Sequence, residues 1–223
     1  MKMKSCAFFD VDYTLLSKSS MLLYVNYMRQ RGEYKFYELI LGSFYLLQYK
    51  LNLLDFEAVT ERVTLRYQGM REEEMVKNCQ EWFEEVVKHY IYPQAIELIE
   101  EHRKQGDELC LLSAITVYLA EPLSRYLGIK HYLCNRLEVE DGVFTGRLVR
   151  PFCYGEGKLV YAQKFAQENG ISLKDSYYYS DSITDLKVLE AFGHPVVINP
   201  DRLLKKEAQK RGWKILYFQP QKS

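Results

Sequence analysis

The sequence has little of what marks a secreted or membrane-spanning protein. Its five cysteines are odd in number and scattered, with no C-x-x-C pair, which excludes a disulfide framework and a zinc site. Free thiols are typical of a reducing compartment. No apolar run approaches the roughly 18 residues of a spanning helix, and acidic residues interrupt the apolar start too early for a signal peptide. We therefore expect a cytoplasmic protein without a transmembrane segment.

An excess of charge of one sign is also absent. Lys plus Arg and Asp plus Glu both number 30, and no basic run occurs, which argues against nucleic acid as a partner. With 48% hydrophobic and 27% charged residues, the chain can bury a core and is not disordered. Its 223 residues suit one domain, or one domain with a sizeable insertion.

Proline is missing between residues 17 and 90, where apolar residues recur at helical spacing. We predict helices at 20–31, 34–49, 55–67 and 71–89, an all-helical block that follows the first strand. The helix at 34–49 is apolar on more than one face, which favours burial within a bundle. The alternative is an exposed apolar face that meets a substrate tail, a partner or a membrane surface.

Strands and helices alternate in the rest of the chain. Strands are predicted at 5–9, 108–112, 177–179, 196–198 and 214–218, and helices at 95–105, 117–127, 158–168, 184–192 and 202–211. Asp141-Gly142 predicts a hairpin within 137–148. This alternation is typical of an α/β fold with a mainly parallel sheet covered on both sides. Residues 1–17 and 91–223 would form this core, with 18–90 as a helical insertion.

Three predicted strands end in polar residues, Asp10, Ser113 and Asp181, and parallel strands place such ends along one edge. Asp12 lies two residues after Asp10. Two close carboxylates need a cation or a proton between them, and Mg²⁺ prefers oxygen ligands. The alternative is that Asp10, Asp12 and Thr14 cap a following helix.

The segment SDSITD follows the strand at 177–179. Asp181 is placed to complete a magnesium site with Asp10. Asp185 lies one helical turn later and is placed to orient the ligands without binding the metal itself. The alternative is that Asp181 or Ser182 caps the next helix. The four histidines are expected to be structural or exposed, because none follows a predicted strand with a carboxylate partner.

Two further segments carry groups that suit an anion. Lys158 follows two glycines in GEGK and can neutralise Asp10 together with a phosphate oxygen. Ser113 can donate its hydroxyl to phosphate, and the amide of Ala114 adds a donor. The alternatives are a solvated lysine and a serine that caps a helix. Neither a P-loop nor a G-x-S-x-G motif occurs, so Ser113 is not assigned as a nucleophile.

The order DVDYT, LLS, GEGK and SDSITD resembles the haloacid dehalogenase superfamily, and within it the phosphatases that use an aspartate nucleophile. The resemblance covers nearly the whole chain. A helical insertion after the first motif and a hairpin after the second are similar to the phosphoserine-phosphatase-like branch. The resemblance implies a Rossmann-like parallel sheet core with an inserted helical cap domain.

The resemblance also implies a role for each motif residue. Asp10 would attack phosphorus and form an aspartyl-phosphate, and Asp12 would act as general acid and then as general base. The implied Mg²⁺ ligands are Asp10, Asp181 and Asp12, the last through its main-chain carbonyl. The implied phosphate-binding residues are Ser113, Ala114, Lys158 and Thr14, with Thr14 also positioning the loop and Asp185 supporting the site.

The implied activity is Mg²⁺-dependent hydrolysis of a small-molecule phosphomonoester. A phosphotransferase or mutase on the same scaffold and a non-catalytic metal-binding interaction module are the alternatives. A dehalogenase is disfavoured, because departure of a halide needs no acid at Asp12. The cap begins Ser17-Lys18-Ser19-Ser20, without the acid that reads the amine of phosphoserine, although Glu33, Glu38 and Glu57 are candidate replacements. The sequence predicts no oligomeric state.

Overall fold

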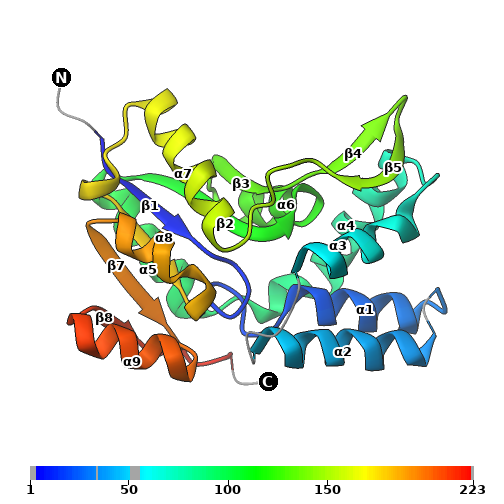
Figure 1. The fold of residues 1–223 in the computed structure, drawn as a ribbon, viewed down its shortest axis with the longest axis horizontal. Coiled ribbons are helices and arrows are strands. Elements are labelled where there is room, and N and C mark those ends of the chain that lie inside the picture. The colour runs from blue at the N-terminus through cyan, green and yellow to red at the C-terminus, as the bar shows by residue number, and fades with distance from the viewer. Residues whose placement is uncertain (1–3, 34, 51–55, 222–223) are drawn as a thin grey trace.

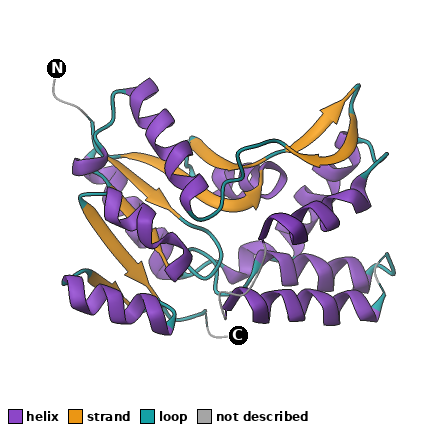
Figure 2. Ribbon diagram, in the orientation of Figure 1, coloured by secondary structure: helices purple, strands orange, loops and turns teal. Residues whose placement is uncertain are grey.

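A computed structural model describes residues 4–33, 35–50 and 56–221 of the chain. Within them the centre is a six-stranded sheet in the order β3-β2-β1-β6-β7-β8, with every neighbouring pair parallel. The strands are β1 (Cys6–Phe9), β2 (Glu108–Thr116), β3 (His131–Asn135), β6 (Tyr177–Ser180), β7 (His194–Ile198) and β8 (Lys214–Leu216). The predicted α/β class is confirmed (Figures 1 and 2).

Helices cover both faces of the sheet, because side chains along each strand alternate between two buried clusters. Phe9 belongs to the cluster that includes α5 and α6, and Phe8 to the cluster that includes α7, α8 and α9. The bounds are α5 (Pro93–Gln105), α6 (Val117–Leu127), α7 (Glu156–Asn169), α8 (Leu186–Ala191) and α9 (Arg202–Arg211). Burial on both faces explains the uninterrupted apolar sequence of β1.

The strand order reverses at β1, which pairs with β2 on one side and with β6 on the other. The chain fills one half of the sheet with β2 and β3 before it returns to build β6, β7 and β8. In open α/β sheets, ligands bind outside the carboxyl ends of the strands at such a reversal. Asp10, the residue after β1, therefore stands where this topology places a ligand site.

Four further helices gather beyond the carboxyl end of β1 (Figure 1). They are α1 (Ser20–Gln30), α2 (Phe36–Lys50), α3 (Phe56–Thr64) and α4 (Glu72–Glu85). The predicted hairpin, formed by β4 (Leu137–Glu140) and β5 (Val143–Leu148), lies against them. Phe144 of β5 donates its amide to Met70 O (2.9 Å) and accepts the amide of Gly69 (3.0 Å). Asp141 and Gly142 have the positive φ angles, 51° and 77°, that a tight hairpin turn requires.

The strand β3 was missed by the sequence interpretation. It is a short edge strand, and its polar ends, His131 and Asn135, conceal the apolar residues between them. The second strand is also longer than predicted. It continues past Ser113 to Thr116, because pairing with β3 resumes at Thr116 and Asn135 after an irregularity. Ser113 therefore lies within the strand, close to its carboxyl end.

Several predicted helix boundaries shift. The helix at 158–168 begins at Glu156, and the one at 184–192 begins with a 3₁₀ turn, Ile183–Asp185, before α8. Two helices of the insertion end in 3₁₀ turns, Leu65–Tyr67 and Val87–Tyr90, which the continuous apolar spacing did not reveal. The predicted starts at Tyr34 and Asp55 lie outside the described residues.

Helix α2 is not buried on all sides. Ile40, Leu41, Phe44 and Leu47 are 40–57% exposed, whereas Tyr45 is buried. The interpretation that favoured burial of this helix within a bundle is wrong for these four side chains, and the alternative of an exposed apolar face holds for them. Among the described residues, no helix combines the length and the apolar character needed to cross a membrane.

A buried polar network ties the sheet to α5 on the side of Phe9. The ring of His102 bonds through Nδ1 to Asp107 Oδ2 (2.7 Å) and through Nε2 to the hydroxyl of Tyr179 (2.6 Å). The hydroxyl of Ser5 donates to the other oxygen of Asp107. The expectation of a structural role for His102 fits, although His102 does have a carboxylate partner, Asp107, which precedes β2 rather than following a strand.

We expect His102→Phe to lower the free energy of unfolding by about 2–4 kcal/mol, because the change leaves a buried carboxylate and a buried hydroxyl without the imidazole. Urea denaturation measures the loss. The control is His194→Phe, since His194 is exposed and stacks on Tyr177, a contact that a phenyl ring keeps. Equal losses in the two variants would contradict a structural role for the His102 network.

Candidate active site

Asp10 is buried at the carboxyl end of β1. Its amide donates to Tyr179 O (2.9 Å), which extends the pairing of β1 with β6 by one residue. Its carboxylate Oδ1 lies 3.0 Å from Nζ of Lys158. Burial raises the pKa of Asp10, and the charge of Lys158 is the largest of the influences that lower it. The carboxylate therefore depends on a cation for its ionised form.

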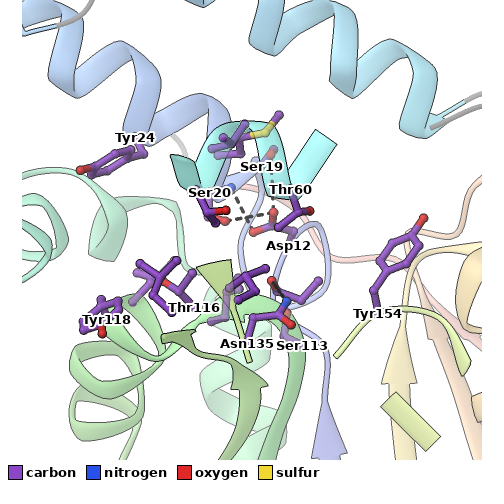
Figure 3. Close-up of a pocket in the computed structure, with 18 of the residues that line it drawn as sticks. Asp12, Ser19, Ser20, Tyr24, Thr60, Ser113, Thr116, Tyr118, Asn135 and Tyr154 are labelled. Carbon is purple, nitrogen blue, oxygen red and sulfur yellow. Dashed lines mark hydrogen bonds between the residues drawn. The ribbon is translucent and has the colours of Figure 1, made fainter. Parts of the chain in front are cut away.

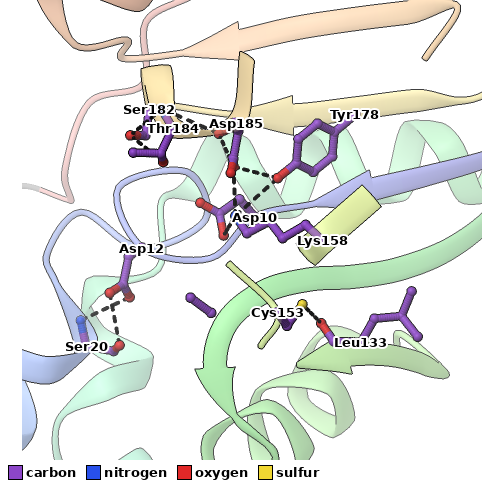
Figure 4. A network of polar contacts seen from close by, with 12 residues as sticks. Asp10, Asp12, Ser20, Leu133, Cys153, Lys158, Tyr178, Ser182, Thr184 and Asp185 are labelled. Carbon is purple, nitrogen blue, oxygen red and sulfur yellow. Dashed lines mark hydrogen bonds and ion pairs between the residues drawn. The ribbon is translucent and has the colours of Figure 1, made fainter. Parts of the chain in front are cut away.

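Lys158 lies in the first turn of α7 and is buried with Asp185 (Figure 4). Its Nζ donates to Asp185 Oδ2 (2.7 Å) and to the hydroxyl of Tyr178 (3.2 Å). Asp185 Oδ2 also accepts from Tyr178 (2.6 Å) and from Ser180 Oγ (2.7 Å). Burial alone would lower the pKa of Lys158, but Asp10 and Asp185 outweigh it and raise the pKa well above its ordinary value. Lys158 is therefore a fixed cation between two carboxylates.

A glycine allows this lysine to reach the sheet. A Cβ atom at Gly157 would lie 1.9 Å from Phe152 O, so no other residue fits there without a shift of the backbone. The preceding loop thus packs directly on the first turn of α7. Of the two glycines in GEGK, Gly157 is the one that a close backbone approach requires, because a Cβ atom at Gly155 would lie an ordinary 3.6 Å from Thr184 O.

Asp181 follows β6 and faces two other carboxylates. Burial, then Asp10 and Asp185, raise its pKa well above the ordinary value. Its Oδ1 is buried and has no hydrogen-bond partner among the described residues. The helix-capping alternative is wrong for Asp181, because the hydroxyl of Ser182 instead accepts the amide of Thr184. A buried, unpartnered carboxylate oxygen beside like charges is a place where a cation would be stabilising.

Asp12 is bound to the start of α1 (Figure 3). Ser20 donates its amide to Asp12 Oδ1 (3.0 Å) and its hydroxyl to Oδ2 (3.1 Å). The N-cap residue, Ser19, makes no side-chain cap bond, so Asp12 satisfies an amide at this helix end. Burial raises the pKa of Asp12 to about 6, against the lowering effect of the bonds from Ser20. The capping alternative thus holds for Asp12 and not for Asp10.

The loop between Asp12 and α1 is a tight turn. Val11 O accepts the amides of Thr14, Leu15 and Leu16 at 3.2, 2.9 and 2.9 Å. Tyr13 has a φ of 59°, a left-handed conformation that is uncommon and strained for a bulky residue. This turn sends Asp10 toward Lys158 and Asp12 toward α1, so the two carboxylates have different neighbours.

The remaining predicted residues divide into two groups. Ser113 and Ala114 line a cavity together with Asp10, Asp12 and Lys158. Thr14 is fully buried, its hydroxyl has no hydrogen-bond partner among the described residues, and it does not line this cavity. Its surroundings suit the predicted role in positioning the loop better than the predicted contact with phosphate. Both roles stay predictions.

The cavity lies between the sheet edge and the helical insertion and has a volume of about 290 Å³ (Figure 3). One end is polar and contains Asp10, Asp12 and Lys158. The walls are mostly apolar or aromatic and come from both parts of the chain; they include Tyr24, Tyr45, Val59, Val63, Met75, Trp82, Ile115, Tyr118, Leu137 and Leu148. The geometry combines a charged end with a neutral body.

Sequence reasoning missed two residues that shape the site. Tyr178 looks like an ordinary core residue in the run YYYS, yet its hydroxyl bonds to Lys158 and Asp185. Asn135 donates to Ala114 O (2.7 Å) and accepts the amide of Cys153 (2.8 Å), which joins the end of β2 to the loop before α7. Prediction of β3 would have placed Asn135 at a strand end, whereas no local signal distinguishes Tyr178.

Comparisons with known proteins agree with this architecture. Residues 7–190 match the family model described as haloacid dehalogenase-like hydrolase. A probable phosphatase from Mycobacterium tuberculosis is 34% identical over 218 residues, which cover 96% of this chain and 76% of that protein. A phosphoserine phosphatase from the same organism is 35% identical over 220 residues, which cover 96% and 71%. The crystal structure of a protein of unknown function from Bordetella pertussis superimposes with a TM-score of 0.87, 27% identity and coverage of 96% and 99%.

Proposed function

The chain belongs to the haloacid dehalogenase-like hydrolase family, and on this basis we propose that it is a magnesium-dependent phosphomonoester hydrolase. The proposed reaction has two steps, through an aspartyl-phosphate on Asp10. The observation that carries the proposal is the buried pair of Asp10 and Lys158, 3.0 Å apart, beside the unpartnered oxygen of Asp181. The edge of the sheet thus combines a nucleophile (Asp10), a fixed cation (Lys158) and a carboxylate that needs a cation (Asp181).

In the first step, Asp10 attacks phosphorus and the ester oxygen departs. Lys158 neutralises the charge shared by Asp10 and the phosphoryl oxygens, and the hydroxyl of Ser113 and the amide of Ala114 hold these oxygens. Asp185 and Tyr178 keep Lys158 in place through the bonds described above. The protein's part in this step is mainly positioning and charge neutralisation.

Asp12 is proposed as the general acid and base. It would protonate the departing ester oxygen and then take a proton from the water that attacks the aspartyl-phosphate, which releases phosphate and restores Asp10. A pKa raised to about 6 suits both tasks near neutral pH, because the protonated and the ionised forms of the carboxyl group are then both accessible. The bonds from Ser20 hold this carboxylate away from Lys158.

The residues present fit a divalent cation. Asp10 and Asp181 would hold it, with the main-chain carbonyl of Asp12 as a third oxygen. Within residues 4–33, 35–50 and 56–221, no three or more His, Cys, Asp or Glu side chains are grouped so that they could hold a metal ion together. We therefore assign only two side-chain ligands, both carboxylates. Bound Mg²⁺ would supply charge stabilisation at the phosphoryl group. Asp185 would support the site from behind.

We further propose that residues 1–17 and 91–223 act as the core domain and 18–90 as a cap that covers the site. Helices α1, α3 and α4 of this segment line the cavity through Tyr24, Val63 and Trp82. The cap would therefore select the substrate, while the core performs the chemistry. A phosphotransferase would share the first step but would pass the phosphoryl group to an acceptor other than water. The proposal therefore requires that water is the acceptor and that inorganic phosphate is released.

Removal and return of the metal tests the proposal. We expect hydrolysis of p-nitrophenyl phosphate with Mg²⁺, a loss of at least about 100-fold with EDTA, and recovery when Mg²⁺ is added back. Mg²⁺ at about a hundred times its Kd should also raise the Tm by roughly 5–10 °C. In Asp181→Asn this shift should fall below about 2 °C, while the metal-free variant becomes more stable than the natural protein because one buried like charge is gone.

The matched control is Asp175→Asn, because Asp175 is exposed and follows no strand of the site. It should keep the natural activity and the natural response of the Tm to Mg²⁺. An Asp181→Asn protein with an unchanged Mg²⁺ response would show that the metal assignment is wrong. Absence of all hydrolysis in the natural protein with Mg²⁺ would instead remove the proposed function and leave a binding module as the explanation.

A further inference from the structure

The cavity contains few charged groups, and those are already paired. Among the described residues that line it, the charged side chains are Asp10, Asp12 and Lys158. Lys158 contacts Asp10 and Asp185, and Asp12 accepts both donors of Ser20. None of the three is left to pair with an ammonium or carboxylate group on the alcohol part of a substrate.

A charged alcohol would need a partner in this cavity, because a buried ion without one is strongly disfavoured. At the start of the insertion, Ser19 and Ser20 line the cavity, but both direct their hydroxyls to Asp12. Glu33 is exposed and pairs with Arg31 rather than lining the cavity. The side chains of Glu38 and Glu57 lie outside the part of the chain that the structure describes.

The cavity is large for a compact alcohol. Its volume of about 290 Å³ would hold on the order of 20 water molecules, at 10–15 Å³ for each. Beyond the polar end, the walls are apolar on both sides. Val59 and Val63 of α3 contribute to one side, and Leu137 and Leu148 of the hairpin contribute to the other. The rings of Tyr24 and Trp82 pack edge to face with centroids 5.0 Å apart.

The apolar wall also reaches the surface. Val63 lines the cavity and is 38% exposed. On α2, Tyr45 lines the cavity while its neighbour Phe44 is 52% exposed. A hydrocarbon chain longer than the cavity would therefore continue along apolar side chains rather than enter water directly. A compact polar alcohol would use neither the volume nor this apolar surface.

Resting on the proposed function, we propose that the substrate is a phosphomonoester of an uncharged, hydrocarbon-rich alcohol. The phosphate would occupy the polar end beside Asp10, and the hydrocarbon would fill the body of the cavity. A simple alkyl phosphate and a monoacylglycerol phosphate share this chemistry. Phosphoserine, whose alcohol carries both an ammonium and a carboxylate group, does not.

The test uses the natural protein with Mg²⁺ and a series of n-alkyl phosphates from ethyl to decyl, each below its micelle concentration. We expect kcat/KM for phosphate release to rise about fourfold for each added methylene until the cavity is full, since the alcohol leaves water for an apolar site. Phosphoserine should be slower than octyl phosphate. A parallel assay with 1-acylglycerol phosphate then shows whether the enzyme prefers an alkyl phosphate or a monoacylglycerol phosphate, and either preference supports the proposal.

Two outcomes overturn this inference while the proposed function stands. One is hydrolysis of p-nitrophenyl phosphate with no dependence of kcat/KM on alkyl length. The other is a higher kcat/KM for phosphoserine than for octyl phosphate, which would require a charged side chain that pairs with its ammonium or carboxylate group. If no phosphate ester is hydrolysed, the proposed function fails instead, so the two failures are distinguishable.

A pair of valine variants adds a structural check. Val63→Asp places a carboxylate in the apolar wall and should lower the ratio of the octyl to the ethyl phosphate kcat/KM by at least about tenfold, because the hydrocarbon then meets a charge. Val76→Asp is the matched control, because Val76 is on α4, is 46% exposed and does not line the cavity. An equal ratio in both variants, each shown to be folded by circular dichroism, would place the alcohol elsewhere.

Discussion

Replacement of Asp10 by Asn is expected to reduce turnover of p-nitrophenyl phosphate by about 10⁴-fold or more, because a neutral amide cannot attack phosphorus to form the acyl phosphate. The change keeps the shape of the side chain and leaves Lys158 paired with Asp185, 2.7 Å away. Steady-state assays with Mg²⁺ measure the loss. Mass spectrometry of the quenched Asp10→Asn protein should detect no phosphorylated peptide under conditions in which the natural protein is labelled.

The matched control for this prediction is Asp141→Asn. Asp141 is exposed in the hairpin turn and has a φ of 51°, a conformation that Asn adopts as readily as Asp. It should keep full activity. Full activity in the Asp10→Asn protein would exclude Asp10 as the nucleophile, and labelling at another residue would name the nucleophile directly.

Asp12→Asn is expected to separate the two steps. The variant loses the proton transfers, so steady-state turnover should fall by about 10²–10⁴-fold. With p-nitrophenyl phosphate, whose phenolate needs little protonation to depart, a burst of one p-nitrophenol per protein should precede the slow phase. With an alkyl phosphate, whose oxygen needs the proton, the burst should be absent. Rapid-quench measurements distinguish these outcomes.

The position of Asp12 makes this variant a clean test. Asn retains an oxygen that can accept the amide of Ser20, so the start of α1 keeps its cap. Affinity for Mg²⁺ should also change little, because the proposed ligand at this residue is the main-chain carbonyl. Loss of Mg²⁺ binding in Asp12→Asn, together with its retention in Asp10→Asn, would mean that the two roles are reversed.

The strongest local patterns predicted the elements of the core well. β1 was predicted because Ala7, Phe8 and Phe9 are consecutive apolar residues, and both faces of this strand are buried. The hairpin was predicted because Asp141-Gly142 suits the left-handed turn that the chain adopts there. In both cases the residues that decide the local conformation are adjacent in sequence, so a short window contains the information.

The sequence was less informative where distant packing decides. β3 forms a strand because it pairs with β2, and its own residue pattern does not indicate one. Helix α2 exposes Phe44 and Leu47, although its sequence resembles that of a buried helix. The network around Asp185 is a further case. Tyr178 and Lys158 meet this carboxylate only because β6 and α7 pack together, and neither residue carries a local sign of that contact.

Apolar spacing and the order of polar residues along the chain are enough to predict the class of fold and the chemical types at the strand ends. The partner of each group depends on how distant segments pack: Lys158 pairs with Asp10, Ser20 binds Asp12, and Asp181 Oδ1 has no side-chain partner within the described residues. Packing matters here because a carboxylate's charge state depends on burial and on charges a few ångströms away. For Asp10 those charges, on Lys158 and Asp185, belong to segments far along the chain, which reach it only when the sheet and its helices are assembled.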